Sequence, residues 1–234
     1  MLIPDSPMDL MIITAHPDDA EFGAAGTVAA WTREGKKAVY VICTNGDKGT
    51  SDRSLTPREL VKIRQREQRE ACKVLGVDTV VFLGYGDQAL EDTPEFRKDL
   101  VRQIRIFRPN TVITLDPYRR YLWHRDHRIV GQVVMDAVFP FARDHMAYPD
   151  LMEEGLEPHK VAQILFFGAE DINYYSDIEA TFDQKLEALT RHASQVRELG
   201  NGDLRSWLEN RCRMLAKGSP YKLAEAFHRV ELPG

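Results

Sequence analysis

The amino-acid sequence predicts a single α/β domain over residues 1–234, with a Rossmann-like open, mostly parallel sheet and helices on both faces. Short apolar runs alternate with longer amphipathic segments, which is the pattern of repeated strand–helix–strand units. No Gly/Ser/Pro-rich linker, internal repeat or low-complexity segment divides the sequence, and its length suits one large domain with a substantial core. These observations together predict one folded unit.

The first elements predict a βαβ unit. Residues 10–15 form a continuous apolar run of the kind that parallel sheets bury on both faces. After a turn at 17–23, apolar residues at helical spacing predict a helix from about 27 to Gly35, and residues 38–44 predict a second strand. Such units cross over right-handedly, so the two strands should be parallel.

The alternation continues through most of the chain. Pro57, a residue allowed in a first helical turn, begins a charged helix that ends before Gly76. The other predicted elements are a loop at 45–56, strands at 79–83, 111–115 and 163–167, helices at 96–107 and 129–137, an irregular stretch at 140–158, and mainly helices from about 178 onward. Ligands of such sheets bind beyond the carboxyl ends of the strands, so the loops that follow strands are the candidate sites.

Composition excludes several classes of protein. Hydrophobic residues make up 43% and charged residues 29%, and the net charge of −5 lacks the basic stripe that nucleic acids or anionic membranes require. Residues 1–8 show neither a positively charged start nor a sustained apolar run, and no stretch approaches the ~18 apolar residues of a membrane span. We therefore expect a cytoplasmic protein with no nucleic-acid partner and no membrane insertion. The three cysteines form no C-x-x-C pair and are expected to be buried free thiols.

The loop after the first strand reads Ala-His-Pro-Asp-Asp-Ala-Glu-Phe-Gly over residues 15–23. Asp18, Asp19 and Glu21 repel one another unless a cation or a proton compensates them, and a bound metal ion is the simplest compensation. Either aspartate could instead cap the following helix. A nucleotide site is disfavoured, because the G-x-G-x-x-G motif is absent and the acids would repel phosphate.

A second polar loop follows the fourth predicted strand and ends in His124-Arg125-Asp126-His127. Strands one and four can be neighbours at the switch point of an open sheet, which would bring the two loops together. His16, Asp19 and His127 would then bind a metal and leave a fourth position for water, as in catalytic zinc sites. Taken alone, His124 and His127 could be surface histidines near a helix start.

At these residues the sequence resembles the LmbE/PIG-L family of metal-dependent N-deacetylases, whose signatures are A-H-P-D-D after the first strand and H-x-D-H after a later one. The resemblance covers nearly the whole chain. It extends through Thr-Asn-Gly-Asp-Lys-Gly at 44–49, Arg64, Glu67, Leu-Gly at 75–76, His-Ala-Ser-Gln at 192–195 and Ala-Glu-Ala-Phe at 224–227.

The resemblance implies a zinc site made of His16, Asp19 and His127, although another divalent metal such as Fe²⁺ would also suit these ligands. It implies that Asp18 is the general base. His124, if protonated, could stabilise the oxyanion, and Asp126 is placed to orient a histidine.

Substrate-binding roles are expected for two further residues. Arg64 resembles the family's substrate-binding arginine, whose planar fork of donors suits hydroxyls or an acidic group. Asp87 follows the third predicted strand, at the edge of the sheet where it could bind hydroxyls. His192, by contrast, is expected to be a packing histidine.

The expected function is hydrolysis of an N-acetyl or other N-acyl group from a small amino-sugar glycoconjugate, by a chain that could be a homo-oligomer. Two alternatives remain open: a non-haem iron oxygenase with the same ligand set, and a catalytically silent metal- or sugar-binding protein. Two departures from the family pattern put substrate preference in doubt. Arg125 stands where many relatives have proline, and the acidic stretches 143–160 and 168–171 lie where we expect the substrate entrance.

Overall fold

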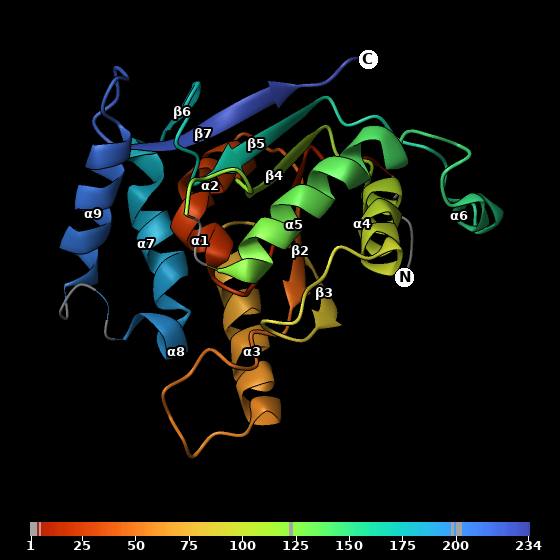
Figure 1. The fold of residues 1–234 in the computed structure, drawn as a ribbon. Helices are drawn as coiled ribbons and strands as arrows, with labels where there is room; N and C mark the ends of the chain where they lie inside the picture. Colours follow the sequence, from red (N-terminus) through yellow and green to blue (C-terminus); the bar gives the residue numbers. More distant parts are fainter. Residues whose placement is uncertain (1–3, 5, 122–123, 198, 200–202) are drawn as a thin grey trace.

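The computed structural model describes residues 4, 6–121, 124–197, 199 and 203–234, so the expectation for residues 1–8 falls partly outside the described residues. Within these ranges the chain forms a seven-stranded sheet in the order β3-β2-β1-β4-β5-β7-β6 (Figure 1). The strands are β1 Leu10–Thr14, β2 Ala38–Thr44, β3 Thr79–Tyr85, β4 Thr111–Leu115, β5 Gln163–Phe167, β6 Tyr174–Asp177 and β7 Ala224–Glu231. The first five strands are mutually parallel, whereas β7 runs antiparallel to both β5 and β6.

Helices cover both faces of the sheet (Figure 1). One layer contains α2 and α3, which both contact α7, and the other contains α4 and α5, which contact each other. The helices are α1 Asp19–Gly23, α2 Ala25–Arg33, α3 Pro57–Val74, α4 Pro94–Phe107, α5 Arg125–Asp136, α6 Pro149–Glu153, α7 Phe182–Thr190, α8 Ala193–Val196 and α9 Leu204–Leu215, with the short helices η1 Ala137–Phe141 and η2 Glu179–Thr181. The predicted Rossmann-like fold is confirmed.

Local sequence explains where the long helix α3 begins. Thr56 accepts a hydrogen bond from the backbone N–H of Glu59, and the Glu59 carboxylate accepts one from the backbone N–H of Thr56. This reciprocal capping box satisfies two amide donors that a helix N-terminus leaves unpaired, and Pro57 occupies a position where its missing N–H costs nothing.

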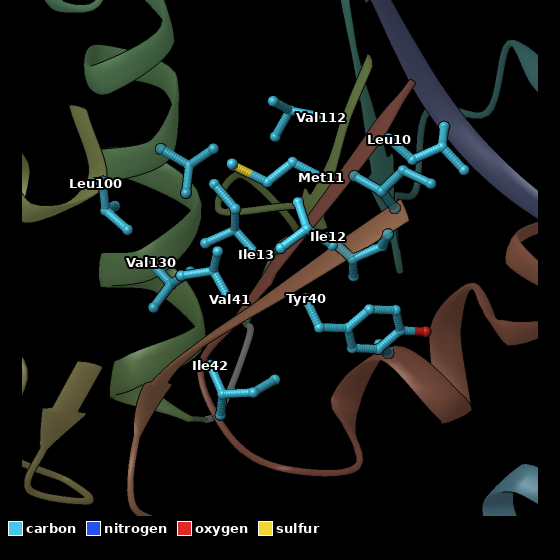
Figure 2. Packing of buried hydrophobic residues seen from close by; sticks show 14 of the residues in the cluster. Leu10, Met11, Ile12, Ile13, Tyr40, Val41, Ile42, Leu100, Val112 and Val130 are labelled. Carbon is cyan, nitrogen blue, oxygen red and sulfur yellow. The ribbon is translucent and has the colours of Figure 1, made fainter. Parts of the chain in front are cut away.

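The core lies along the two central strands. Every residue of β1 and β2 is buried, because helices cover both faces of these strands. Figure 2 shows Ile12 and Ile13 of β1 packed among side chains from β2, α4 and α5, including Ile42, Leu100 and Val130. The continuous apolar runs seen in the sequence are therefore the signature of strands without a solvent-facing side.

The sheet brings the two candidate loops together. β1 pairs with β2 on one side and with β4 on the other, so the chain reverses its direction of winding between β1 and β4. Because both strands are parallel, the loops at their carboxyl ends open at the same edge of the sheet. The predicted adjacency of strands one and four is confirmed.

Two element predictions were wrong. Residues Asp19–Gly23, predicted as a turn, form the short helix α1. Residues 224–231, predicted within a mainly helical region, form β7, which pairs with the last parallel strand along the whole length of that strand. A strand is stabilised by partners distant in sequence, and local pattern alone did not reveal them. Among the residues that the structure describes, no helix has both the length and the apolar character needed to cross a bilayer.

Candidate metal centre and active site

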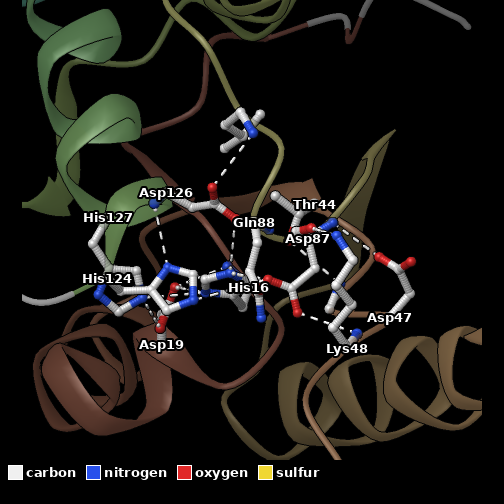
Figure 3. Close-up of polar contacts among 12 residues, drawn as sticks. His16, Asp19, Thr44, Asp47, Lys48, Asp87, Gln88, His124, Asp126 and His127 are labelled. Atoms are coloured by element: carbon white, nitrogen blue, oxygen red, sulfur yellow. Dashed lines mark hydrogen bonds and ion pairs between the residues drawn. The ribbon is translucent and has the colours of Figure 1, made fainter.

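Three side chains from the two loops converge at the carboxyl edge of β1 and β4 (Figure 3). Nδ1 of His16 lies 3.2 Å from Nε2 of His127 and 3.5 Å from Oδ2 of Asp19, and Nε2 of His127 lies 3.1 Å from Oδ1 of Asp19. Ligand atoms that surround a zinc ion tetrahedrally at ~2.0–2.1 Å stand about 3.3 Å apart. The two histidine nitrogens therefore stand at the spacing of metal ligands, and each lies near a different carboxylate oxygen of Asp19.

The other ring nitrogen of His16 faces two carboxylates. Nε2 lies 3.1 Å from Oδ1 of Asp87 and 3.3 Å from Oδ2 of Asp126, whose side chain is fully buried. Carboxylates accept hydrogen bonds, so Nε2 carries a hydrogen. A metal ion at the predicted position would displace the hydrogen of Nδ1 and bind the lone pair of that nitrogen. The histidine that Asp126 is predicted to orient is therefore His16, and Asp87 contacts the same ring nitrogen.

The charge balance of the cluster favours a cation. Burial would lower the pKa of His16, but hydrogen bonds to Asp126, Asp19 and Asp87 raise it to about 11. Burial would raise the pKa of Asp19, but the neighbouring His127 and His16 hold it well below its usual range. A His16 ring with that pKa is itself positively charged at neutral pH, and a bound divalent metal ion would supply the positive charge among these carboxylates in its place.

Asp18 is buried beside the cluster with its backbone in the left-handed region, at φ 98°. Its N–H donates to Oε1 of Gln68 at 3.1 Å, and its Oδ2 lies 3.2 Å from Nη2 of Arg64. Burial raises the pKa of Asp18 to about 6, although the positive charge of Arg64 opposes the rise. A carboxylate with that pKa is ionised at neutral pH and basic enough to take up a proton.

His124 is the N-cap of α5, and its Nδ1 accepts a hydrogen bond from the backbone N–H of Asp126 at 3.2 Å. Burial lowers the pKa of His124, and the nearby rings of His16 and His127 lower it further. The imidazole is therefore neutral, with its hydrogen on Nε2, and it can donate a hydrogen bond in that form. The expected role of His124 in stabilising the oxyanion stays a prediction, with the N–H of Nε2 as the donor.

The two residues predicted to bind substrate are both buried, with Arg64 at 4% and Asp87 at 4% side-chain exposure. Arg64 donates to the carbonyl oxygens of Pro17 and Gly46, and Asp87 contacts His16 and the backbone N–H of Lys48. A Cβ on Gly46 would lie 2.2 Å from Nη1 of Arg64, so only glycine fits there. These contacts hold the loops of the site, and the substrate-binding role of both residues stays a prediction.

Glu21 does not belong to the metal cluster, contrary to its inclusion among the repelling acids of the first motif. Its Oε1 accepts from Nε2 of Gln68 at 3.0 Å, and its Oε2 lies 3.2 Å from Nε2 of His192. His192 is completely buried, in line with the expected packing role, and it also carries this electrostatic contact. Glu21 and His192 both appeared in the sequence motifs, whereas Gln68 did not. Nothing in the positions of Glu21 and His192 along the chain indicated that the two side chains meet.

A buried ion pair stabilises the backbone at the end of the first motif. Nζ of Lys185 lies 2.5 Å from Oε1 of Glu225, with both side chains 1% exposed. The Glu225 carboxylate accepts from the backbone N–H groups of Gly26 and Thr27, and Lys185 donates to the carbonyl oxygens at the end of α1. Strand β7 and helix α7 thus fix the break between α1 and α2, a role that sequence analysis missed.

Among the departures from the family pattern, Arg125 and residues 143–160 make their contacts away from the metal cluster, whereas Gly168 lines the cavity beside it. Arg125 donates to the carbonyl oxygen of Leu90 at 3.2 Å and pairs with Glu91, so it does not reach into the site. Residues 143–160 are attached to α4, through ion pairs of Lys98 and Arg102 and hydrogen bonds from Arg105, rather than at a substrate entrance. Residues 143–160 do not line the cavity beside the cluster, whereas Gly168 does, and an influence of either stretch on substrate entry stays a prediction.

Comparison with known proteins agrees with the two motifs. The family model described as PIG-L, GlcNAc-PI de-N-acetylase, matches residues 11–138. The chain is 35% identical over 189 residues to the diacetylchitobiose deacetylase of Thermococcus kodakarensis, covering 81% of this chain and 70% of that protein. It is 29% identical over 191 residues to the "Probable N-acetyl-alpha-D-glucosaminyl L-malate deacetylase 2" of Bacillus anthracis, covering 80% of each.

A solved structure shows the same architecture. The N,N'-diacetylchitobiose deacetylase from Pyrococcus horikoshii, determined with an inhibitor, superposes with a TM-score of 0.90 at 30% sequence identity. The superposition covers 95% of this chain and 83% of that one. The family model spans both sequence motifs, the relatives cover most of the chain, and the chain is a member of the PIG-L family.

Proposed function

We propose that this chain is a zinc-dependent hydrolase that removes an N-acetyl, or another N-acyl, group from a small amino-sugar-containing substrate. The observation that carries the proposal is the convergence of His16, Asp19 and His127 on one point, with the carboxylate of Asp18 buried beside it. The relatives named above are deacetylases, which supports hydrolysis of a linear amide. We further infer a cytoplasmic protein, and a homo-oligomer stays a prediction.

In this proposal His16, Asp19 and His127 hold the zinc ion. When bound, zinc would polarise the acyl carbonyl and lower the pKa of a water molecule. Asp18 takes the proton of the attacking water and later passes it to the leaving amine, which its pKa of about 6 permits. General acid–base catalysis of this kind contributes about 10²–10⁴-fold to the rate.

His124 donates a hydrogen bond from Nε2 to the oxygen on which negative charge develops. A neutral imidazole suffices, because the donor needs only its N–H, and loss of such a donor costs about 10²–10³ in kcat. Asp126 and Asp87 hold His16 in the tautomer that binds the metal.

The alternative of an iron oxygenase uses the same three ligands but gives Asp18 no task as a base. A catalytically silent binding protein does not require a carboxylate whose pKa is raised toward neutrality by burial, as that of Asp18 is. The deacetylase interpretation therefore accounts for more of the site than either alternative.

The test combines metal analysis with an amine assay. Purified wild type should hold roughly one zinc per chain and release amine from N-acetylglucosamine or N,N'-diacetylchitobiose. His16→Ala should lose both metal and activity, whereas His145→Ala, at an exposed histidine, should keep both. Metal retention without amine release from any N-acetyl amino sugar would contradict the deacetylase proposal, and oxygen consumption with a cosubstrate would favour the oxygenase.

A further inference from the structure

A cavity of about 180 Å³ opens beside the cluster, between the carboxyl ends of β4 and β5 and the helices α1 and α9. Asp19 and His127 line it on the side of the metal position, and Arg119 and Arg211 line it as well. The two arginines are contributed by segments almost a hundred residues apart, the loop after β4 and helix α9. A group bound in this cavity would contact both the reacting centre and these arginines.

The floor of the cavity is apolar and closely packed. A Cβ on Gly23 would lie 2.2 Å from the ring of Phe167, so the absence of a side chain at Gly23 lets this ring lie against α1. Phe22 packs against Trp207 of α9 with ring centroids 6.1 Å apart, and the guanidinium of Arg211 lies 6.0 Å from the same indole ring. Stacking on Trp207 therefore links the position of Arg211 to the helix that carries Asp19.

The two arginines that line the cavity are not paired with the two aspartates that line it. Asp116 is the one lining acid besides Asp19, and its Oδ1 already accepts a hydrogen bond from the backbone N–H of Tyr118 at 2.8 Å. In the part of the chain that the structure describes, neither Arg119 nor Arg211 forms an ion pair with an acid. The pKa of Arg211 is lowered, first because surrounding protein removes water from it and further because Arg119 carries a like charge nearby.

Arg119 and Arg211 are both exposed to solvent at this cavity, and their planar forks match carboxylate and phosphate oxygens. An anion bound between them would relieve the repulsion of their like charges. A divalent metal at the predicted position would offset the charge of Asp19, and among the residues that line this cavity the two arginines would then outnumber Asp116. In a chain with a net charge of −5, such a local positive field would attract anionic ligands selectively.

We propose that this cavity is an anionic subsite, in which Arg119 and Arg211 bind a carboxylate or phosphate group attached to the amino sugar. The inference rests on the proposed function and narrows it: the preferred substrate is an N-acetyl amino sugar with an acidic substituent rather than a neutral glycoside.

The test measures binding separately from turnover. Zinc-loaded Asp18→Asn, which keeps the metal ligands but lacks the base, is titrated with three probes. These are N-acetylglucosamine 1-phosphate, a glycoside of N-acetylglucosamine with a hydroxycarboxylic acid, and the neutral methyl glycoside. At least one anionic probe should bind about 10–100-fold more tightly than the methyl glycoside, as expected for hydrogen bonds to charged groups. The preference should shrink in ~1 M salt, where the Debye length is about 3 Å.

Arg119→Gln together with Arg211→Gln, introduced into the same background, should reduce this preference to near unity. The matched control is Arg213→Gln, which removes a charge from the same helix at a residue that pairs with Glu209 and does not line the cavity. A preference for only one of the two anions supports the subsite and identifies its ligand. Equal binding of all three probes, or a preference that survives the double substitution, would overturn it.

Wild-type turnover of the same probes keeps the two proposals distinguishable. Amine release from every probe with no anion preference in binding would leave the deacetylase standing without the subsite. An arginine-dependent anion preference without any amine release would leave the subsite standing and count against the deacetylase.

Discussion

Nη2 of Arg64 lies 3.2 Å from Oδ2 of Asp18, and both side chains are almost completely buried. The pair joins the middle of α3 to the loop after β1, and Arg64 also donates to the carbonyl oxygens of Pro17 and Gly46. Arg64 therefore acts on the proposed general base directly, by charge, and on its loop, by hydrogen bonds.

This contact predicts a shift in the pH profile of Arg64→Gln. Burial raises the pKa of Asp18 to about 6 while Arg64 lowers it, so loss of the guanidinium leaves a still higher pKa. Only ionised Asp18 accepts a proton, so kcat/KM falls as pH decreases through the pKa, and this fall should begin at higher pH in the variant. The measurement is kcat/KM against pH. Arg66→Gln, an exposed neighbour on α3, should keep the wild-type profile; an unshifted Arg64→Gln profile would argue against the charge effect.

Asp126→Asn should weaken metal binding without unfolding the protein. The carboxylate fixes the hydrogen of His16 on Nε2, and loss of such a partner costs about 10–100-fold in metal affinity. Competition with a chelator measures the affinity, and circular dichroism checks the fold. Asp136→Asn, near the far end of the same helix, serves as the control and should bind metal as the wild type does. Unchanged affinity in Asp126→Asn would remove the orienting role.

Lys185→Met should destabilise the chain by about 3–5 kcal/mol, because it leaves the buried carboxylate of Glu225 without its partner. Adding Glu225→Gln should recover part of the loss by removing the uncompensated charge. Denaturant unfolding measures the free energies, with Lys222→Met as the control for an exposed ion pair, where about 0–1 kcal/mol is expected. A similar small effect at Lys185 would show that the buried pair contributes little.

His192→Gln should lower stability most at acidic pH. Burial would lower the pKa of His192, but the Glu21 carboxylate and, more weakly, Asp18 raise it above its ordinary value. A raised folded pKa contributes stability that is complete below about 6.5 and is lost as pH rises through the folded value. The difference in unfolding free energy between wild type and variant should therefore shrink toward alkaline pH. A difference that is constant with pH would mean that His192 contributes packing alone.

The local pattern of the chain determined most of the architecture. Apolar runs without alternation predicted the doubly covered strands β1, β2, β4 and β5, and the polar loops after β1 and β4 predicted where the site would lie. These features depend on residues that are neighbours along the chain, so they can be read without knowledge of the fold. The family resemblance followed from the same two loops.

Only the tertiary structure decided how the side chains of those loops are used. It placed Glu21 against His192 and Arg64 against Asp18. It fixed a hydrogen on Nε2 of His16 and made Nδ1 of His124 an acceptor. It also brought Arg211 to the cavity that Arg119 lines, and β7 to the edge of the parallel strands. Most of these relationships join segments distant along the chain, and each is selected by burial and by the need to pair polar groups away from water, which residue spacing does not encode.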